Sequence, residues 1–272
     1  MSANWSLGLD TLRVQNADED NWLSNGDEVY MVVIPFRAKL GLPGSAQTST
    51  NTWATYDWAK HVSKGAVRHI PGNIGRTTFA NVASFGVSQF LGAGHGSTNP
   101  AFKPEILGIV SLAFESDNTS WSSMHSIIDK AAPVVRAELE AVVANEMTPL
   151  DKLTAQQLTD KLKGSANHIK DAITPSVLAQ IGLFLSSAGD PDDFIDFGIN
   201  WFTNLDPELV VCFQQMKEAK DATMSGKAKP ADQSTAALIA RSGLHPLAPG
   251  GFQNLYDKSG VAYLVEGSVG HA

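Results

Sequence analysis

The amino-acid sequence predicts an α+β fold, in which a C-terminal strand completes an N-terminal β-sandwich-like region and several short helices lie between them. Three observations predict this arrangement. Up to about residue 119, β-branched and aromatic residues cluster between stretches rich in Gly and Asn. From about residue 120 apolar residues recur at helical spacing, and near the C-terminus a strand-like alternation returns. We therefore expect a β-rich region at 1–119, a helical region at 120–245, and a loop with a returning strand at 246–272.

Five segments are expected to be strands. They are 7–14, 28–34, 67–70, 106–114 and 260–269. The second of them is apolar on both alternating faces, which is typical of a central strand covered on both sides. The last one follows the helices, so we expect it to pair with the N-terminal sheet. Residues 41–65 are expected to form a long loop, and 72–104 receive no assignment.

The helical region is predicted from its helix starts. A capping residue precedes a proline at four places, which are Thr148–Pro149, Thr174–Pro175, Asp190–Pro191 and Asp206–Pro207. After the third of these, one face of a helix would carry Phe194, Phe197, Gly198, Trp201 and Phe202. We therefore expect five or six short helices between 122 and 222, and another at 236–241.

Composition and charge exclude some classes of function. The chain has 272 residues, 43% of them hydrophobic and 18% charged, so we expect a globular protein with a sizeable core. A formal net charge of -8 opposes binding to a phosphate backbone, so we expect no nucleic-acid partner. The first residues lack the features of a signal peptide, and no apolar run is long enough for a transmembrane segment. We expect a soluble protein made in the cytoplasm, with non-classical, machine-dependent export as an alternative.

Two acidic loops are the strongest functional signal in the sequence. One follows the strand at 7–14 and the other follows the strand at 106–114. Their carboxylates are those of Asp18, Asp20, Asp27, Glu28, Glu115 and Asp117. Calcium takes about six to eight oxygen ligands from carboxylates, carbonyls and water. If both loops lie at one end of a sandwich, we expect these residues to hold Ca²⁺. The alternative is that they form solvated turns and cap backbone amides.

The same residues resemble parts of a C2 domain. That family has aspartates in a strand–loop–strand segment ending in an Asp-Pro-Tyr-Val-like motif, and an Asp-x-Asp pair in a later loop. This chain has Asp20, then Gly-Asp-Glu-Val-Tyr at 26–30, then Glu115-Ser-Asp117. The likeness covers residues 7–36 and 106–119, with Glu-Val in place of the proline and Glu at the start of the later pair. The resemblance implies a calcium-dependent binding module for a lipid or protein partner.

No pattern in the sequence assigns a catalytic residue. The histidines are scattered, without the His-Glu-x-x-His or Cys-x-x-Cys spacing of a zinc site. The leading hypothesis is therefore a non-enzymatic binding or interaction protein with calcium in its acidic loops. The alternatives are a toxin or effector with a β receptor-binding part and a membrane-active helical part, a structural component of a larger assembly, and a hydrolase with an unidentified acid or histidine.

Overall fold

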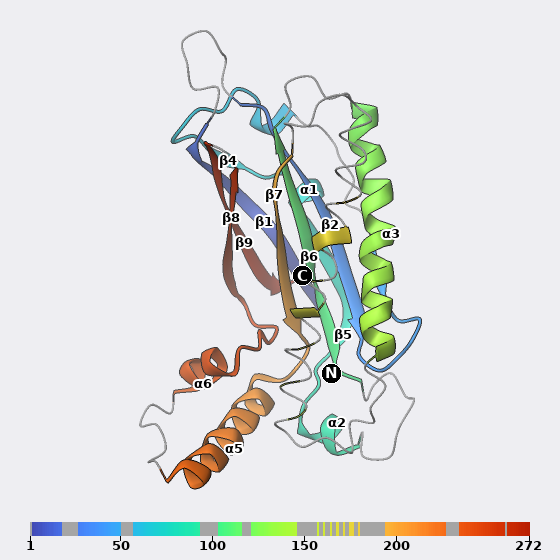
Figure 1. The fold of residues 1–272 in the computed structure, drawn as a ribbon, viewed down its shortest axis with the longest axis vertical. Helices are drawn as coiled ribbons and strands as arrows, with labels where there is room; N and C mark the ends of the chain where they lie inside the picture. Colours follow the sequence, from blue (N-terminus) through green and yellow to red (C-terminus); the bar gives the residue numbers. More distant parts are fainter. Residues whose placement is uncertain are drawn as a thin grey trace.

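The strands of the computed structural model form two antiparallel sheets, which pack face to face (Figure 1). The structure describes residues 2–17, 27–49, 57–92, 103–115, 121–145, 157, 160, 164, 167–168, 171, 174–176, 179, 194–226, 234–258 and 260–272. At 57, 91–92, 121–128 and 144–145 it describes the backbone alone. The α+β class predicted from the sequence is confirmed.

The first sheet contains both ends of the chain. Its strand order is β4-β1-β9-β8, and β5 also pairs with β1. The bounds are β1 Ser2–Asn16, β4 Val67–His69, β5 Arg76–Ala83, β8 Gly250–Lys258 and β9 Val261–His271. β9 pairs with β1 from Trp5↔His271 to Asn16↔Ala262. The prediction that a terminal strand completes the N-terminal sheet is therefore confirmed.

The second sheet is built around a ladder of two long strands. Its order is β3-β2-β6-β7. The bounds are β2 Val29–Lys39, β3 Gln47–Thr48, β6 Glu105–Glu115 and β7 Phe194–Thr203. β2 and β6 are each 11 residues long and pair along their whole length. β2 is buried on both faces for most of its length, as its apolar sequence predicted.

Alternation along β2 and β6 divides the core into two layers. Even-numbered residues, such as Tyr30 and Phe114 with their rings stacked at 4.9 Å, lie in a cluster with helix α3. Odd-numbered residues, such as Met31 and Ile109, pack against the first sheet in the interior of the sandwich. Burying one such side chain stabilises the fold by about 1.5–3 kcal/mol. The ladder therefore needs a layer on each side, and Figure 1 shows α3 running along its outer face.

Two helices, α5 and α6, pack on each other beside one end of the sandwich (Figure 1). The helical elements with described bounds are η1 Asp57–Ala59, α1 Gly72–Gly75, α2 Val87–Gly92, α3 Trp121–Asn145, α5 Pro207–Ser225 and α6 Thr235–Ser242. α5 starts where the sequence predicts, with Asp206 as N-cap accepting the Glu208 N–H. α6 confirms the helix predicted at 236–241, and it ends at Gly243, whose φ of 65° suits a glycine.

The residues expected on one helix face, Phe194, Phe197, Gly198, Trp201 and Phe202, lie instead in strand β7. That prediction is wrong because the segment also alternates, and its aromatic and β-branched residues favour a strand. A glycine in its middle also weakens a helix. β7 pairs with β6 along its length, and so provides hydrogen-bond partners for a strand that is buried on both faces.

The helical region also differs in detail from the prediction. Residues 121–145 form a single helix of 25 residues, which contains Pro133. Among the predicted starts, Thr148–Pro149 and Asp190–Pro191 lie outside the described residues. Thr174 is itself helical, so it does not serve as a non-helical cap. The region expected to be helical at 120–245 thus contains helices, including α3, α5 and α6, and also a strand of the second sheet.

Gly108 allows β7 to lie close to β6, and it gives a test of this pairing. A Cβ at Gly108 would stand 2.1 Å from the Asn200 carbonyl oxygen and 2.9 Å from the Trp201 Cα. Gly108→Ala should therefore lower the free energy of unfolding by about 1–3 kcal/mol, because strand β7 must shift. Gly270→Ala in β9, where nothing lies within 4 Å of the new Cβ, should change it by less than about 0.5 kcal/mol. Urea unfolding measures both values, and equally small changes would contradict the observed packing.

Candidate functional site

The described strand ends next to the two acidic loops lie at the same end of the sandwich. Val29 at the start of β2 pairs with Glu115 at the end of β6. Asp27 and Glu28 immediately precede Val29, so all three described carboxylates belong to this end. The condition set by the sequence, that both loops lie at one end, therefore holds for the described strand ends. Asp18, Asp20 and Asp117 lie outside the described residues.

Asp27 is a buried carboxylate with a structural partner. It is 0% exposed, and its Oδ2 accepts a hydrogen bond from the Tyr263 hydroxyl at 2.7 Å. Its backbone N–H and C=O both bond to Val62. Tyr263 belongs to β9 of the first sheet, so the side-chain bond connects the two sheets at this end. One oxygen of the Asp27 carboxylate is thus engaged within the sandwich.

Glu28 and Glu115 are half-buried. The Glu28 carboxylate lies 4.0 Å from Nε2 of His61, which is an ion pair when the imidazole is protonated. Among the described residues, no three His, Cys, Asp or Glu side chains gather as a metal site. The calcium ligands named from the sequence therefore stay a prediction.

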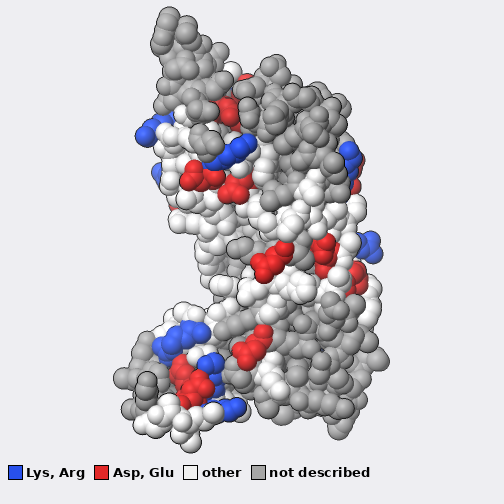
Figure 2. All heavy atoms as spheres, viewed as in Figure 1, with Lys and Arg blue, Asp and Glu red and all other residues white. Residues whose placement is uncertain are grey.

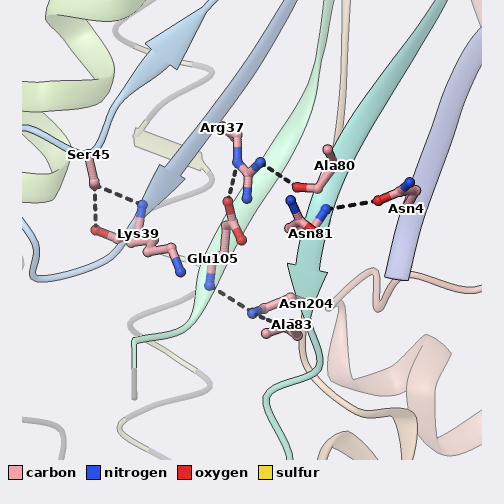
Figure 3. Close-up of polar contacts among 9 residues, drawn as sticks. All are labelled: Asn4, Arg37, Lys39, Ser45, Ala80, Asn81, Ala83, Glu105 and Asn204. Carbon is pink, nitrogen blue, oxygen red and sulfur yellow. Dashed lines mark hydrogen bonds and ion pairs between the residues drawn. The ribbon is translucent and has the colours of Figure 1, made fainter. Parts of the chain in front are cut away.

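At the opposite end of β6, the side chain of Asn204 connects three strand ends. Its Oδ1 accepts the Glu105 backbone N–H at 2.7 Å, and its Nδ2 donates to the Ala83 carbonyl at 2.8 Å (Figure 3). The Asn204 carbonyl accepts the Phe85 N–H, and the Phe85 carbonyl in turn accepts the Asp206 N–H. These bonds determine where the chain leaves β7 and where the N-cap of α5 lies.

Arg37 and Glu105 form an ion pair at this same end. Arg37 Nε donates to Glu105 Oε1 at 2.5 Å, and the two side chains are 20% and 1% exposed. The guanidinium also donates to the Ala80 carbonyl at 3.0 Å (Figure 3). Since Ala80 lies in β5, Arg37 connects the neighbouring strands β2 and β6 with the facing sheet.

A groove lies where β7 ends and the two helices begin. The Thr203 N–H donates to the His245 carbonyl at 2.8 Å, and the Thr203 carbonyl accepts the Leu247 N–H at 2.9 Å. These bonds hold the segment between α6 and β8 against the end of β7. Figure 1 shows α5 and α6 projecting from the sandwich, and Figure 2 shows the outline of the molecule indented between them and the sandwich.

The larger part of this groove, here called the aliphatic lobe, has a volume of about 550 Å³. Its apolar walls include Pro207, Ala236, Ile239, Ala240, Leu244 and Pro246. The alanines and the isoleucine recur on α6 at intervals of three and four, so one face of this helix forms a wall. A hollow of this size and lining is typical of a site for a small organic molecule.

The smaller part, the aromatic lobe, has a volume of about 290 Å³. It shares Phe202 and His245 with the aliphatic lobe and adds Trp201 and Phe252. The Trp201 and His245 rings meet edge to face with centroids 5.1 Å apart, and those of Phe202 and Phe252 are 6.1 Å apart. The described residues that line the two lobes include no Asp, Glu, Lys or Arg.

His245 is the titratable side chain of the groove. Its residue is exposed overall, yet partial burial of the ring lowers the pKa of the imidazole below 6.5. The ring is therefore neutral at pH 7, and it then offers one N–H donor and one nitrogen acceptor. Chemically, this arrangement can desolvate an apolar molecule and orient it through one hydrogen bond.

Sequence reasoning did not find this groove. It assigned Trp201 and Phe202 to a helix, and it gave His245 no role. The alternation of Phe197, Ile199 and Trp201 was a usable signal for a strand. Nothing local, however, indicates that Phe202 and His245 line one hollow, because their proximity depends on the bonds of Thr203 with His245 and Leu247.

Comparisons with known proteins do not assign this chain to a family. No protein-family model, no curated protein and no solved structure matches it. The resemblance to C2 domains therefore stays a prediction, as do the effector and assembly hypotheses. No described helix combines the length and the apolar character needed to cross a bilayer.

The ion pair between Arg37 and Glu105 gives a test of the network beside the groove. Arg37→Met should lower the free energy of unfolding by about 2 kcal/mol or more, because it leaves the Glu105 carboxylate buried without its cation. Arg13→Met removes a pair with Glu266 that is 4.0 Å apart and 47% and 38% exposed, so its cost should stay below about 1 kcal/mol. Guanidinium unfolding at one pH compares them. A cost for Arg13→Met equal to that for Arg37→Met would show that the network contributes little.

Proposed function

We propose that this protein is a non-enzymatic binding protein whose ligand is a small, mainly apolar molecule held in the groove. The observation that carries the proposal is the aliphatic lobe of about 550 Å³ with its apolar lining. Small-molecule sites commonly have volumes of about 300–1,000 Å³, mostly apolar walls and few polar groups. An uncharged lining favours a ligand without charge, because no opposite charge would compensate for its desolvation.

Contacts outside the groove support its walls before any ligand binds. Arg241 of α6 donates to Glu218 Oε1 of α5 at 2.8 Å, and Gln214 donates to the same oxygen at 2.8 Å. Glu218 is 7% exposed, so its carboxylate is shielded from water, whereas the Arg241 side chain is 33% exposed. Leu209 and Val210 of α5 in turn pack in the core layer that also contains residues of α3. A site that is ordered in advance loses less conformational entropy on binding, which supports a binding role.

Filling the aliphatic lobe gives the test of this function. Ala240→Trp should weaken binding of Nile red, an uncharged dye whose emission rises in apolar sites, by about tenfold or more because the indole occupies the lobe. Ala219→Trp, at an exposed alanine on α5, should leave the dissociation constant within about twofold of the wild-type value. Fluorescence titration measures both. The proposal fails if the wild type does not bind the dye, or if the two variants bind it equally.

A second candidate function, calcium-dependent binding, is favoured by one specific observation. The register of β2 with β6 brings the described ends of both acidic loops to one end of the sandwich. Among the described residues, Glu28 and Glu115 are suitable for substitutions that test calcium binding. Asp27 is a poor choice for substitution, because the loss of its bond to Tyr263 would destabilise the sandwich whether or not calcium binds.

Thermal unfolding with millimolar calcium and with chelator tests this second function. A cation at about 100 times its dissociation constant stabilises by about 2.7 kcal/mol, or roughly 5–10 °C at this chain length. Glu28→Gln combined with Glu115→Gln should abolish most of that shift, whereas Glu266→Gln on β9 should preserve it. If the wild-type Tm is the same in calcium and in chelator, the acidic loops do not hold calcium at these concentrations.

A further inference from the structure

We infer that the groove selects an uncharged aromatic molecule that carries a hydrogen-bonding group on its ring and an aliphatic chain, such as an alkylphenol. The inference rests on the proposed function and names the ligand class of the same groove. The ring lies in the aromatic lobe, its polar group bonds to His245, and the chain extends into the aliphatic lobe.

The two lobes share part of their lining. Phe202 and His245 line both hollows, so the two lobes adjoin at these side chains. A single molecule that fills both lobes therefore passes beside His245. Volumes of about 290 Å³ and about 550 Å³ assign the smaller, compact part of the ligand to the aromatic lobe and the larger part to the aliphatic lobe.

The walls of the two lobes differ in their side chains. The aromatic lobe presents Trp201, Phe202 and Phe252, and aromatic pairs gain interaction energy beyond their buried area in offset-stacked or edge-to-face arrangements. The pair of Trp201 with His245 already adopts the edge-to-face arrangement, at 82° between ring planes. Apart from Phe202 and His245, the aliphatic lobe is lined by Ala, Ile, Leu, Pro and Gly residues. This contrast predicts a ring in one lobe and an alkyl chain in the other.

The polar group of the ligand needs a hydrogen-bonding partner in the groove. Asn200 also lines the aromatic lobe, but its amide exchanges hydrogen bonds with Asn254 at 2.6 Å and 3.1 Å. The His245 carbonyl is bonded to the Thr203 N–H. Among the described side chains that line the lobes, the imidazole of His245 is therefore the group that can accept a hydrogen bond from a ligand hydroxyl, because the Trp201 indole N–H can only donate. Burial of the ring favours its neutral form, which can donate to or accept from a hydroxyl group.

The experiment uses the 272-residue chain and four compounds that share a six-membered ring with a butyl chain. They are 4-butylphenol, 4-butylcyclohexanol, butylbenzene and 4-butylbenzoate, each measured by displacement of Nile red. We expect 4-butylphenol to bind about threefold to tenfold more tightly than its saturated analogue, because only the phenol ring interacts with the aromatic walls. We also expect it to bind more tightly than butylbenzene, which lacks the hydroxyl group, and we expect the anionic benzoate not to displace the dye.

Two histidine variants isolate the polar contact. His245→Phe keeps a ring in the wall but removes both nitrogens, so the preference for butylphenol over butylbenzene should disappear. His69→Phe, at an exposed histidine of β4, should keep that preference. In the wild type, butylphenol affinity should fall as pH decreases through the lowered pKa of His245, because the ligand further excludes water from an imidazole that must then carry charge. In His245→Phe this fall should vanish.

The outcomes separate this inference from the function on which it rests. If Nile red binds and Ala240→Trp blocks it, but the saturated alcohol or the benzoate binds as tightly as the phenol, the ligand class is wrong and the binding function stands. An unchanged phenol preference in His245→Phe overturns the assigned role of His245. Absence of any dye binding to the wild type overturns both the function and the ligand class.

Discussion

The structure depends on one constraint, which is that the ladder of β2 and β6 is apolar on both faces. A strand pair of this kind needs a covering layer on each side, because apolar area left in water costs about 25 cal/mol per Å². The first sheet covers one face, and α3 contributes to the cover of the other. Because both faces are apolar, a shift of register by one residue would still leave apolar side chains on both faces. Polar contacts therefore help to select one register, because they form in that register alone. The contacts are Arg37 with Glu105, Ser111 with Tyr256, and Asp27 with Tyr263.

The tyrosine contacts show how the sandwich tolerates polar groups inside it. The Tyr256 hydroxyl lies 2.6 Å from Ser111 Oγ across the two sheets, and burial raises the pKa of this phenol to about 12. The phenol therefore stays neutral at physiological pH, so the hydrogen bond needs no charge in the core. A buried polar group with a partner costs little, whereas one without a partner costs about 1–3 kcal/mol. Each bond thus favours the one alignment of the sheets that satisfies it.

The two candidate sites lie at opposite ends of this scaffold. Glu115 ends β6 beside the acidic loops, and Glu105 begins it beside the network that leads to the groove. Eleven residues of strand separate them by roughly 34 Å, at about 3.4 Å per residue. Next to Glu105, hydrogen bonds of two residues position the walls of the groove. Asn204 fixes the start of α5, and Thr203 holds the segment that contains His245. The groove therefore owes its shape to a rigid sheet end, which is a common setting for a ligand site.

The sequence by itself determined the features that depend on neighbouring residues. Apolar residues on both faces identified β2 as a covered strand, alternation identified the terminal strand β9, and cap chemistry located the start of α5 at Asp206–Pro207. It also named the acidic residues, although it could not show that Asp27 is engaged with Tyr263. Only the tertiary structure decided that 194–203 is a strand and that Phe202 and His245 line one groove. The reason is physical: helical and alternating patterns both fit that segment, and the backbone of β6, buried on both faces, needed a hydrogen-bonding partner.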